Sequence, residues 1–393
     1  MKKNYLFGMF ALAALTMVGC SNDEVVNDYS QDNAIEFGTY VGRDAQSRGT
    51  EFDQDALEDQ GFGVFAYYTG TAPFNAATHT AANFMKNTHV IYDETKVNSV
   101  GGPWTYTPIK YWPNNLGDKV SFFAYAPYNA AYTMTAGTIT YTVPTVLADQ
   151  KDLVWNTSKA IDLTKQNVDD KVKFIFRHAL SKIGLKVAAA TDEVALGNNM
   201  LDENTKIIVK RVMLTGSEVA YASASDGKTE TYAATDIFTK TATLDLNNFD
   251  AEGNEVAADW TTVGTDVQSY TFVSNDFVDD KELELNSTNS NVLQQLNAED
   301  SYLMIIPQDL STTGFNVFIE YDVITTDPGT DNIDDSFTVT NRINKSVKIK
   351  FESNKQYTLK LILGMTSVKL EAEVSEWGTD DEEVDLPQNN PNN

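Results

Sequence analysis

The sequence is poor in the residues that build thiol and metal chemistry. It contains one cysteine, Cys20, and three histidines among 393 residues. A single cysteine excludes a disulfide within the chain and cannot supply a zinc thiolate cluster. The histidines His79, His89 and His178 lie in unrelated contexts without metal-ligand spacing. We therefore expect no cofactor and no bound metal, and a core large enough to form without disulfides.

Basic residues are also scarce. The chain has 29 Lys and Arg against 56 Asp and Glu, which gives a formal net charge of −27. No basic block interrupts this acidity, whereas proteins that bind nucleic acid concentrate positive charge on one face. The balance argues against a nucleic-acid partner and fits an extracellular surface.

Catalytic motifs are missing as well. The sequence has no HExxH, GxSxG, P-loop or dinucleotide glycine fingerprint. Carboxylates are so abundant that neighbouring pairs arise by chance, and none is marked for acid–base work. We expect His178 to make a structural hydrogen bond at a strand end. The sequence therefore predicts a protein that is not an enzyme.

The apolar run at residues 5–18 is too short to span a bilayer comfortably. It follows Lys2 and Lys3 and ends at Gly19 and Cys20, the pattern of a secretory signal with a small residue at the cleavage site. With the sole cysteine at its end, this stretch resembles a bacterial lipoprotein signal. The resemblance implies that residues 1–19 are removed and that Cys20 is acylated, for example with palmitate. The alternative is an ordinary signal peptide that ends beside a free thiol.

Residues 20–33 follow the signal and are rich in Asp, Asn and Ser, which disfavours packed structure. The sequence at 21–24, Ser-Asn-Asp-Glu, resembles the acidic tether that directs lipoproteins of the Bacteroides group to the outer face of the outer membrane. A plain solvated linker is the alternative. The expected location is the cell surface, at the outer membrane.

Short apolar or alternating segments separated by turn residues fill the rest of the chain and predict an all-β fold of β-sandwiches. A polar stretch at 156–170 suggests a boundary between domains at 34–167 and 168–379. The acidic, Pro- and Asn-rich residues 380–393 are expected to be a disordered tail. The main predicted strands are 34–41, 62–68, 84–92, 120–128, 138–143, 172–178, 182–187, 207–214, 242–246, 302–306, 315–321, 337–339, 347–351, 357–363 and 367–374.

Two stretches carry binding chemistry with alternatives left open. The aromatic residues Trp104, Tyr106, Tyr111 and Trp112 could stack on sugar rings, although aromatics at strand positions more often belong to a core. The oxygens between Asp327 and Asp335 could collect a calcium ion. Their spacing departs from that of an EF-hand, so a solvated loop is favoured.

A series of short motifs spans nearly the whole chain after Cys20. In this order, they resemble the fimbrillin family of the Bacteroides and Porphyromonas group, the pilus subunits and minor-fimbria-like adhesins. The resemblance implies two transthyretin-like β-sandwich domains, in agreement with the strand pattern. The motifs are FGVFAYY at 62–68, WTYTP at 104–108, KYWP at 110–113, SFFAYAP at 121–127, FRHALSK at 176–182, IPQ at 306–308 and VSEW at 374–377.

The resemblance also implies assembly with other fimbrial subunits by strand exchange. Family members are cut after an arginine that follows the first strand, and a neighbour's C-terminal strand fills the vacated groove. In this chain Arg48 is the expected scissile residue and Arg43 the second choice. The strand removed would be 35–41, with Ile35, Phe37, Tyr40 and Val41 expected to fill apolar space. An ordinary loop arginine is the alternative for Arg48.

One departure concerns the C-terminus. Family stalk subunits carry a donor strand there, but the residues after Trp377 include four consecutive acids and only Val384 and Leu386 as apolar residues. Such a segment would fill an apolar groove poorly. The sequence therefore favours a tip or accessory subunit, with a host or bacterial surface ligand as a further partner. A glycan-binding surface lipoprotein is the alternative function.

Overall fold

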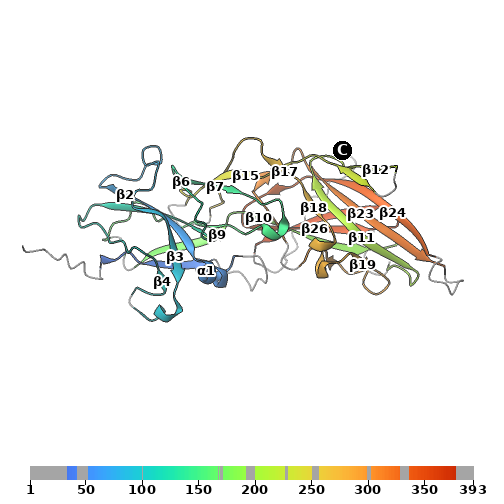
Figure 1. Cartoon of the computed structure of the whole chain (residues 1–393), viewed down its shortest axis with the longest axis horizontal. Coiled ribbons are helices and arrows are strands. Elements are labelled where there is room, and N and C mark those ends of the chain that lie inside the picture. The colour runs from blue at the N-terminus through green and yellow to red at the C-terminus, as the bar shows by residue number, and fades with distance from the viewer. Residues whose placement is uncertain are drawn as a thin grey trace, which may run out of the picture.

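The computed structural model describes residues 33–41, 52–99, 101–166, 168, 171–191, 200–225, 229–249, 256–298, 302–327 and 336–377. Their regular structure is almost entirely β-strand, which confirms the all-β fold class, and α1 (Gln54–Gln60) is the α-helix within these ranges. The molecule is elongated, with the N-terminal strands at one end and the longest C-terminal strands at the other (Figure 1). Short 3₁₀ helices lie in the connections, at Glu94–Lys96, Leu147–Asp149, Ser274–Asp276 and Val278–Asp280.

One seven-stranded sheet organises the N-terminal end, in the order β1-β9-β8-β5-β2-β3-β4. Its neighbours are antiparallel except for β1, which runs parallel to β9. The buried side chains of one face form the N-terminal core, which includes Phe37, Phe62, Trp104, Phe122 and Phe174. The strands are β1 (Phe37–Val41), β2 (Phe62–Gly70), β3 (Met85–Tyr92), β4 (Trp104–Thr105), β5 (Lys119–Ala126), β8 (Val154–Asn156) and β9 (Val172–His178).

Two sheets pack against each other at the C-terminal end and enclose the C-terminal core, which includes Leu185, Val209, Phe315, Tyr321 and Leu359. One has the order β20-β10-β26-β27 with β21 also on β10, and the other has the order β18-β11-β23-β24 with β19 also on β11. The strands are β10 (Ser181–Ala189), β11 (Thr205–Thr215), β18 (Tyr270–Phe272), β19 (Leu283–Leu285), β20 (Gln294–Gln295), β21 (Leu303–Ile305), β23 (Phe315–Thr326), β24 (Ser336–Val347), β26 (Lys355–Leu363) and β27 (Val368–Glu376).

A third group of strands joins the two ends. The order β16-β15-β7-β6 unites strands from residues near 140 with strands near 250. A separate junction core lies beside it and draws Trp155, Leu244, Met304 and Trp377 from both halves of the chain. The remaining strands are β6 (Met134–Thr135), β7 (Thr138–Thr142), β12 (Ala220–Ser223), β13 (Glu230–Ala233), β14 (Phe238–Thr239), β15 (Thr241–Asp245), β16 (Trp260–Thr262), β17 (Val267–Gln268), β22 (Gln308–Asp309) and β25 (Lys350–Phe351).

Strand pairing crosses the division that the sequence suggested at 167/168. That division assigns β9 to the C-terminal half, whereas β9 lies between β1 and β8 in the N-terminal sheet. The physical reason is its alternation, which places Val172, Phe174 and Phe176 on the buried face, where they complete the N-terminal core. The organisation of the chain as two tandem domains stays a prediction.

The strand β24 and the helix α1 show where the sequence patterns fell short of the structure. β24 is one strand of twelve residues, although its mostly polar residues 340–346 gave no strand signal, because it pairs with β23 along its whole length. The helix α1 was not predicted. Its signals are local: the Asp53 side chain accepts a hydrogen bond from the Ala56 amide at 2.8 Å, and Gly61 ends the helix with a positive φ.

Candidate functional site

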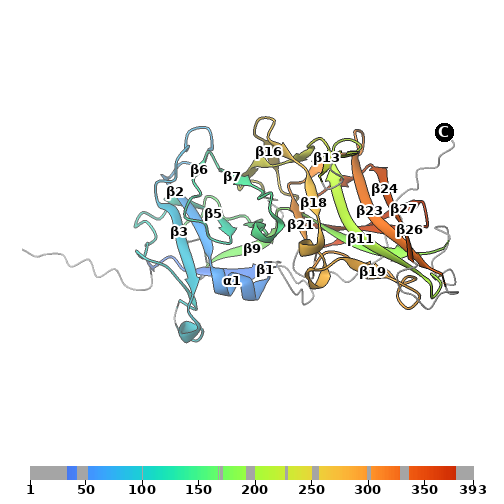
Figure 2. The same ribbon diagram turned by 45° about the vertical axis from the view of Figure 1, so that its right-hand side comes forward.

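The candidate site is the N-terminal edge of the first sheet, where residues 33–41 lie between two other segments. β1 pairs with β9 in parallel from Phe37 opposite Val172 to Val41 opposite Phe176. On the other side, the Ile35 amide donates to the Lys110 carbonyl at 2.8 Å and the Trp112 amide donates to the Asn33 carbonyl at 2.9 Å. Figure 2 shows β1 beside β9, next to α1. The predicted edge strand is thus confirmed.

The inward side chains of this segment are apolar and well packed. Ile35, Phe37 and Val41 are 1, 0 and 7% exposed, whereas Tyr40 is 47% exposed. The expectation that Tyr40 fills the groove is therefore wrong, because strand alternation turns it to the opposite face. The Phe37 ring stacks on Phe174 with centroids 5.4 Å apart. The segment fills a groove whose other walls are aromatic.

Tyr106 fastens the segment from the far wall of the groove. Its ring centroid lies 5.4 Å from that of Phe37, and its hydroxyl donates to the Ile35 carbonyl at 2.7 Å. The same hydroxyl accepts from the Lys110 amide at 3.3 Å. Burial raises the pKa of Tyr106 to about 12, so the hydroxyl stays protonated and can donate at physiological pH. The Tyr106 hydroxyl thus binds a backbone carbonyl, a group that any strand in this position would offer.

The two predicted sugar-stacking tryptophans belong to this core. Trp104 and Trp112 are 7 and 3% exposed. Trp104 meets Phe62 edge-on at 5.1 Å, and Trp112 meets Phe122 edge-on at 5.9 Å. The core alternative for the aromatic cluster is confirmed at these positions, because buried rings present no face to a sugar.

A second polar contact holds the chain just after the undescribed residues 42–51. The Phe52 amide donates to the Asp152 Oδ2 atom at 3.3 Å, and Phe52 itself is buried. The His178 Nδ1 atom lies 2.5 Å from the same carboxylate oxygen, and its ring stacks on Trp377 at 4.3 Å. The prediction of a structural hydrogen bond for His178 is confirmed. The sequence analysis did not predict that Asp152 binds both Phe52 and His178, because no motif marks this residue.

The predicted modification sites lie outside the described residues. This holds for Cys20, for Arg43 and Arg48, and for nearly all of the Asp327–Asp335 stretch. In the ranges that the structure describes, no group of three His, Cys, Asp or Glu side chains is placed to hold a metal ion. Across the same ranges, no helix has the length and hydrophobicity needed to traverse a bilayer.

Comparison with known proteins assigns the chain to a protein family. A family model described as fimbrillin-like matches residues 48–377. The chain belongs to this fimbrillin-like family. The match begins after β1, so the matched region contains the groove and leaves out the strand that fills it. The family comprises fimbrial proteins rather than enzymes.

Two similar proteins are fimbrial proteins of Phocaeicola vulgatus and Bacteroides vulgatus. The fimbrium subunit Fim1C of Phocaeicola vulgatus is 30% identical over 406 residues, covering 96% of this chain and 97% of that protein. The crystal structure of a fimbrial protein from Bacteroides vulgatus is 21% identical, with a TM-score of 0.62 over 88% of this chain and 99% of the other. This fimbrillin-like protein therefore shares its fold with a solved fimbrial protein along nearly the whole of that structure.

Proposed function

We propose that this protein is a fimbrial subunit of the cell surface that joins a neighbouring subunit by strand exchange. Cleavage after Arg48, or after Arg43, converts β1 into a separable peptide, and a strand from another subunit replaces it. The observation that carries the proposal is the groove around residues 33–41.

The groove has the properties that strand addition requires. Loss of residues 33–41 frees the backbone edge of β9 and the polar groups of Tyr106 and Lys110 that now hold the segment. It also uncovers the aromatic walls that surround Phe37. Main-chain hydrogen bonds supply affinity for an incoming strand, and pockets for alternate side chains supply specificity. An unfilled groove of this kind is unstable, so replacement is favoured.

The contacts on either side of residues 42–51 support cleavage in between. Val41 is held by β9, and Phe52 is held by Asp152. A cut between them leaves the retained end anchored and makes only β1 free to leave. Before the cut, β1 is part of the same chain, and its effective concentration of about millimolar or more excludes competing strands.

The lipid anchor belongs to the same proposal. Acylation of Cys20 holds the uncut chain at the outer membrane, and stable anchoring requires more than one acyl chain. Cleavage after Arg48 separates the body from the anchored peptide. The acidic residues that follow Trp377 favour a tip or accessory position, in which the subunit receives a strand and donates none.

The test uses the double variant Arg43→Ala and Arg48→Ala, expressed in the native cell. Mass spectrometry of the subunit in wild-type fimbriae should find an N-terminus at Gly49. The double variant should keep an acylated Cys20 at its N-terminus and should be missing from fimbriae. Lys281→Ala is the matched control, because Lys281 is an exposed basic residue in another connection. Assembly of the double variant at the wild-type level would refute strand removal, and an unacylated Cys20 would refute the anchor.

A further inference from the structure

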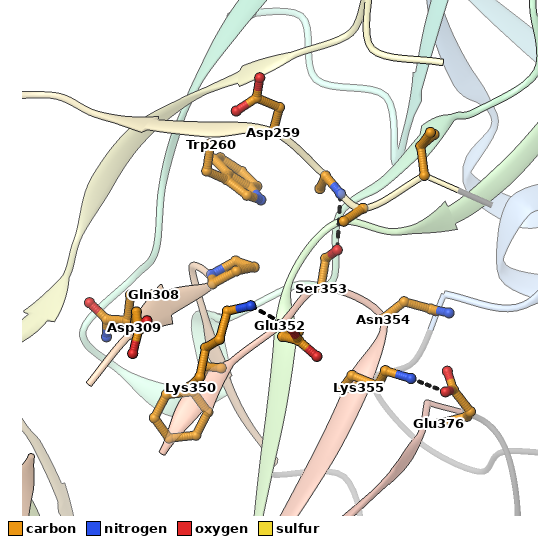
Figure 3. Close-up of a pocket in the computed structure, with 15 residues that line it drawn as sticks. Asp259, Trp260, Gln308, Asp309, Lys350, Glu352, Ser353, Asn354, Lys355 and Glu376 are labelled. Atoms are coloured by element: carbon orange, nitrogen blue, oxygen red, sulfur yellow. Dashed lines mark hydrogen bonds and ion pairs between the residues drawn. The ribbon is translucent and has the colours of Figure 1, made fainter. Parts of the chain in front are cut away.

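A pocket lies where the β15–β16 ribbon meets the C-terminal sheets. Its walls come from four separated segments: residues 256–260, residues 307–309 at β22, residues 350–355 around β25, and Glu376 at the end of β27. Its volume is about 480 Å³, within the range of small-molecule sites. It lies away from the groove around β1. In Figure 3, Trp260 and Asp259 line one side, and Lys350 and Glu352 lie across from them.

Trp260 is an aromatic wall held in one orientation. Its Nε1 atom donates to the Ala179 carbonyl at 2.8 Å, which fixes the indole against the junction core. The other four tryptophans, at 104, 112, 155 and 377, are at most 7% exposed, whereas Trp260 is partly exposed at the pocket. A partly exposed indole whose nitrogen is already satisfied offers its ring, rather than its N–H group, to a ligand.

The polar lining mixes donors and acceptors. Lys350 pairs with Glu352 at 2.8 Å, and Lys355 pairs with Glu376. Gln308 accepts through its Oε1 atom from the Thr239 amide at 3.1 Å. Its Nε2 atom is buried and has no hydrogen-bond partner within the described part of the chain. The pocket itself offers ammonium donors and carboxylate acceptors together, which suits a ligand whose groups both donate and accept hydrogen bonds.

We propose that this pocket binds a neutral saccharide through Trp260. A pyranose ring presents an apolar C–H face that packs on an indole, and hydroxyls that both donate and accept hydrogen bonds. The lining carries four carboxylates, Asp259, Asp309, Glu352 and Glu376, against two lysines that already hold carboxylate partners. This acidic surplus disfavours an anionic sugar.

The proposal does not rest on strand exchange, and its experiment reads the pocket directly. The probes are galactose, glucose, mannose, fucose, N-acetylglucosamine, N-acetylgalactosamine and lactose, each titrated into the purified full chain. Acrylamide quenching of tryptophan fluorescence reports mainly on Trp260, because the other indoles are buried. At least one sugar should reduce the quenching constant by about half at saturation, at millimolar sugar concentration, a level common for single-ring ligands.

Three variants separate binding from folding. Trp260→Leu should abolish sugar binding measured by calorimetry, and Asp259→Asn, at an exposed position on the same wall, should weaken it about tenfold. Phe337→Leu is the control, because it removes an aromatic ring that is 69% exposed on β24, outside the pocket. Thermal unfolding of each variant verifies the fold. Binding that survives both pocket variants, binding of trilysine in preference to every sugar, or no binding below about 20 mM would each overturn the proposal.

Discussion

The two ends of the molecule close their sheets in different ways. At the N-terminal end, β1 contributes five residues and runs parallel to β9. The undescribed residues 42–51 separate it in sequence from the rest of the N-terminal sheet. At the C-terminal end, β27 contributes nine residues, pairs antiparallel with β26 throughout, and is followed by Trp377 in the junction core. We therefore expect the short terminal strand β1 to be easier to exchange than β27, which is long and is followed by a residue of the junction core.

The largest effect should come from the strand that we propose is replaceable. Phe37→Ala removes a ring that is fully buried against other aromatics, and such truncations cost about 3–5 kcal/mol of unfolding free energy. Denaturant unfolding measures this loss, and hydrogen exchange should place the weakened amides in β1 and β9 rather than in β26 and β27. Phe337→Ala, at an exposed position of the C-terminal strand β24, should change the free energy of unfolding by no more than about 0.5 kcal/mol. Equal effects of the two changes would remove the contrast between the ends.

A smaller effect should come from Lys182 in β10, at the junction. Burial lowers the pKa of Lys182 to about 7, and its Nζ atom lies 3.8 Å from the Tyr302 ring centroid. The unfolded chain holds this proton up to about pH 10.4, so the cost of burying the amine is greatest below pH 7 and disappears as the pH rises toward 10.4. Lys182→Met should therefore raise the unfolding free energy, by on the order of 2 kcal/mol near pH 6.

That gain should shrink steadily between pH 7 and pH 10. Thermal unfolding of wild type and variant across pH 5–10 measures the difference, with Lys206→Met at an exposed position of β11 as the control. A gain that is constant with pH would mean that Lys182 affects stability through packing alone.

The smallest effect should come from the hairpin β12–β13, which covers β24. The Arg342 guanidinium lies 3.6 Å from the Tyr221 ring centroid and pairs with Glu320 at 2.7 Å. Arg342→Lys keeps the charge and loses the planar stack and fork, so it should cost about 1 kcal/mol. Faster hydrogen exchange confined to the hairpin, residues 220–233, would show that the Arg342 side chain holds the hairpin against β24. Unchanged exchange there would mean that the hairpin is held by its backbone alone.

Local patterns predicted the strands, but their partners required the folded chain. Alternation at 172–178 correctly indicated β9, yet its place between β1 and β8 depends on aromatic side chains more than a hundred residues away. Arg43 and Arg48 lie in a polar stretch of sequence that predicts a cleavage site, while the contact that holds Phe52 comes from Asp152, which no sequence motif marks. The sequence likewise could not predict that Trp260 lines a pocket, because the pocket forms only where four separated segments meet. Sequence patterns report on neighbours along the chain and carry little information about distant contacts.

The contact at Asp152 also bears on mechanical load. Phe52, which follows the proposed cleavage site, and Trp377, which follows the last strand, are bridged by Asp152 and His178. When the chain is pulled from these two positions, tension enters and leaves the subunit at nearly the same place. The force would cross this short bridge and spare the long strands of both ends. Single-molecule pulling between residues 52 and 377 should therefore give a low first rupture force followed by the stronger resistance of the sheets.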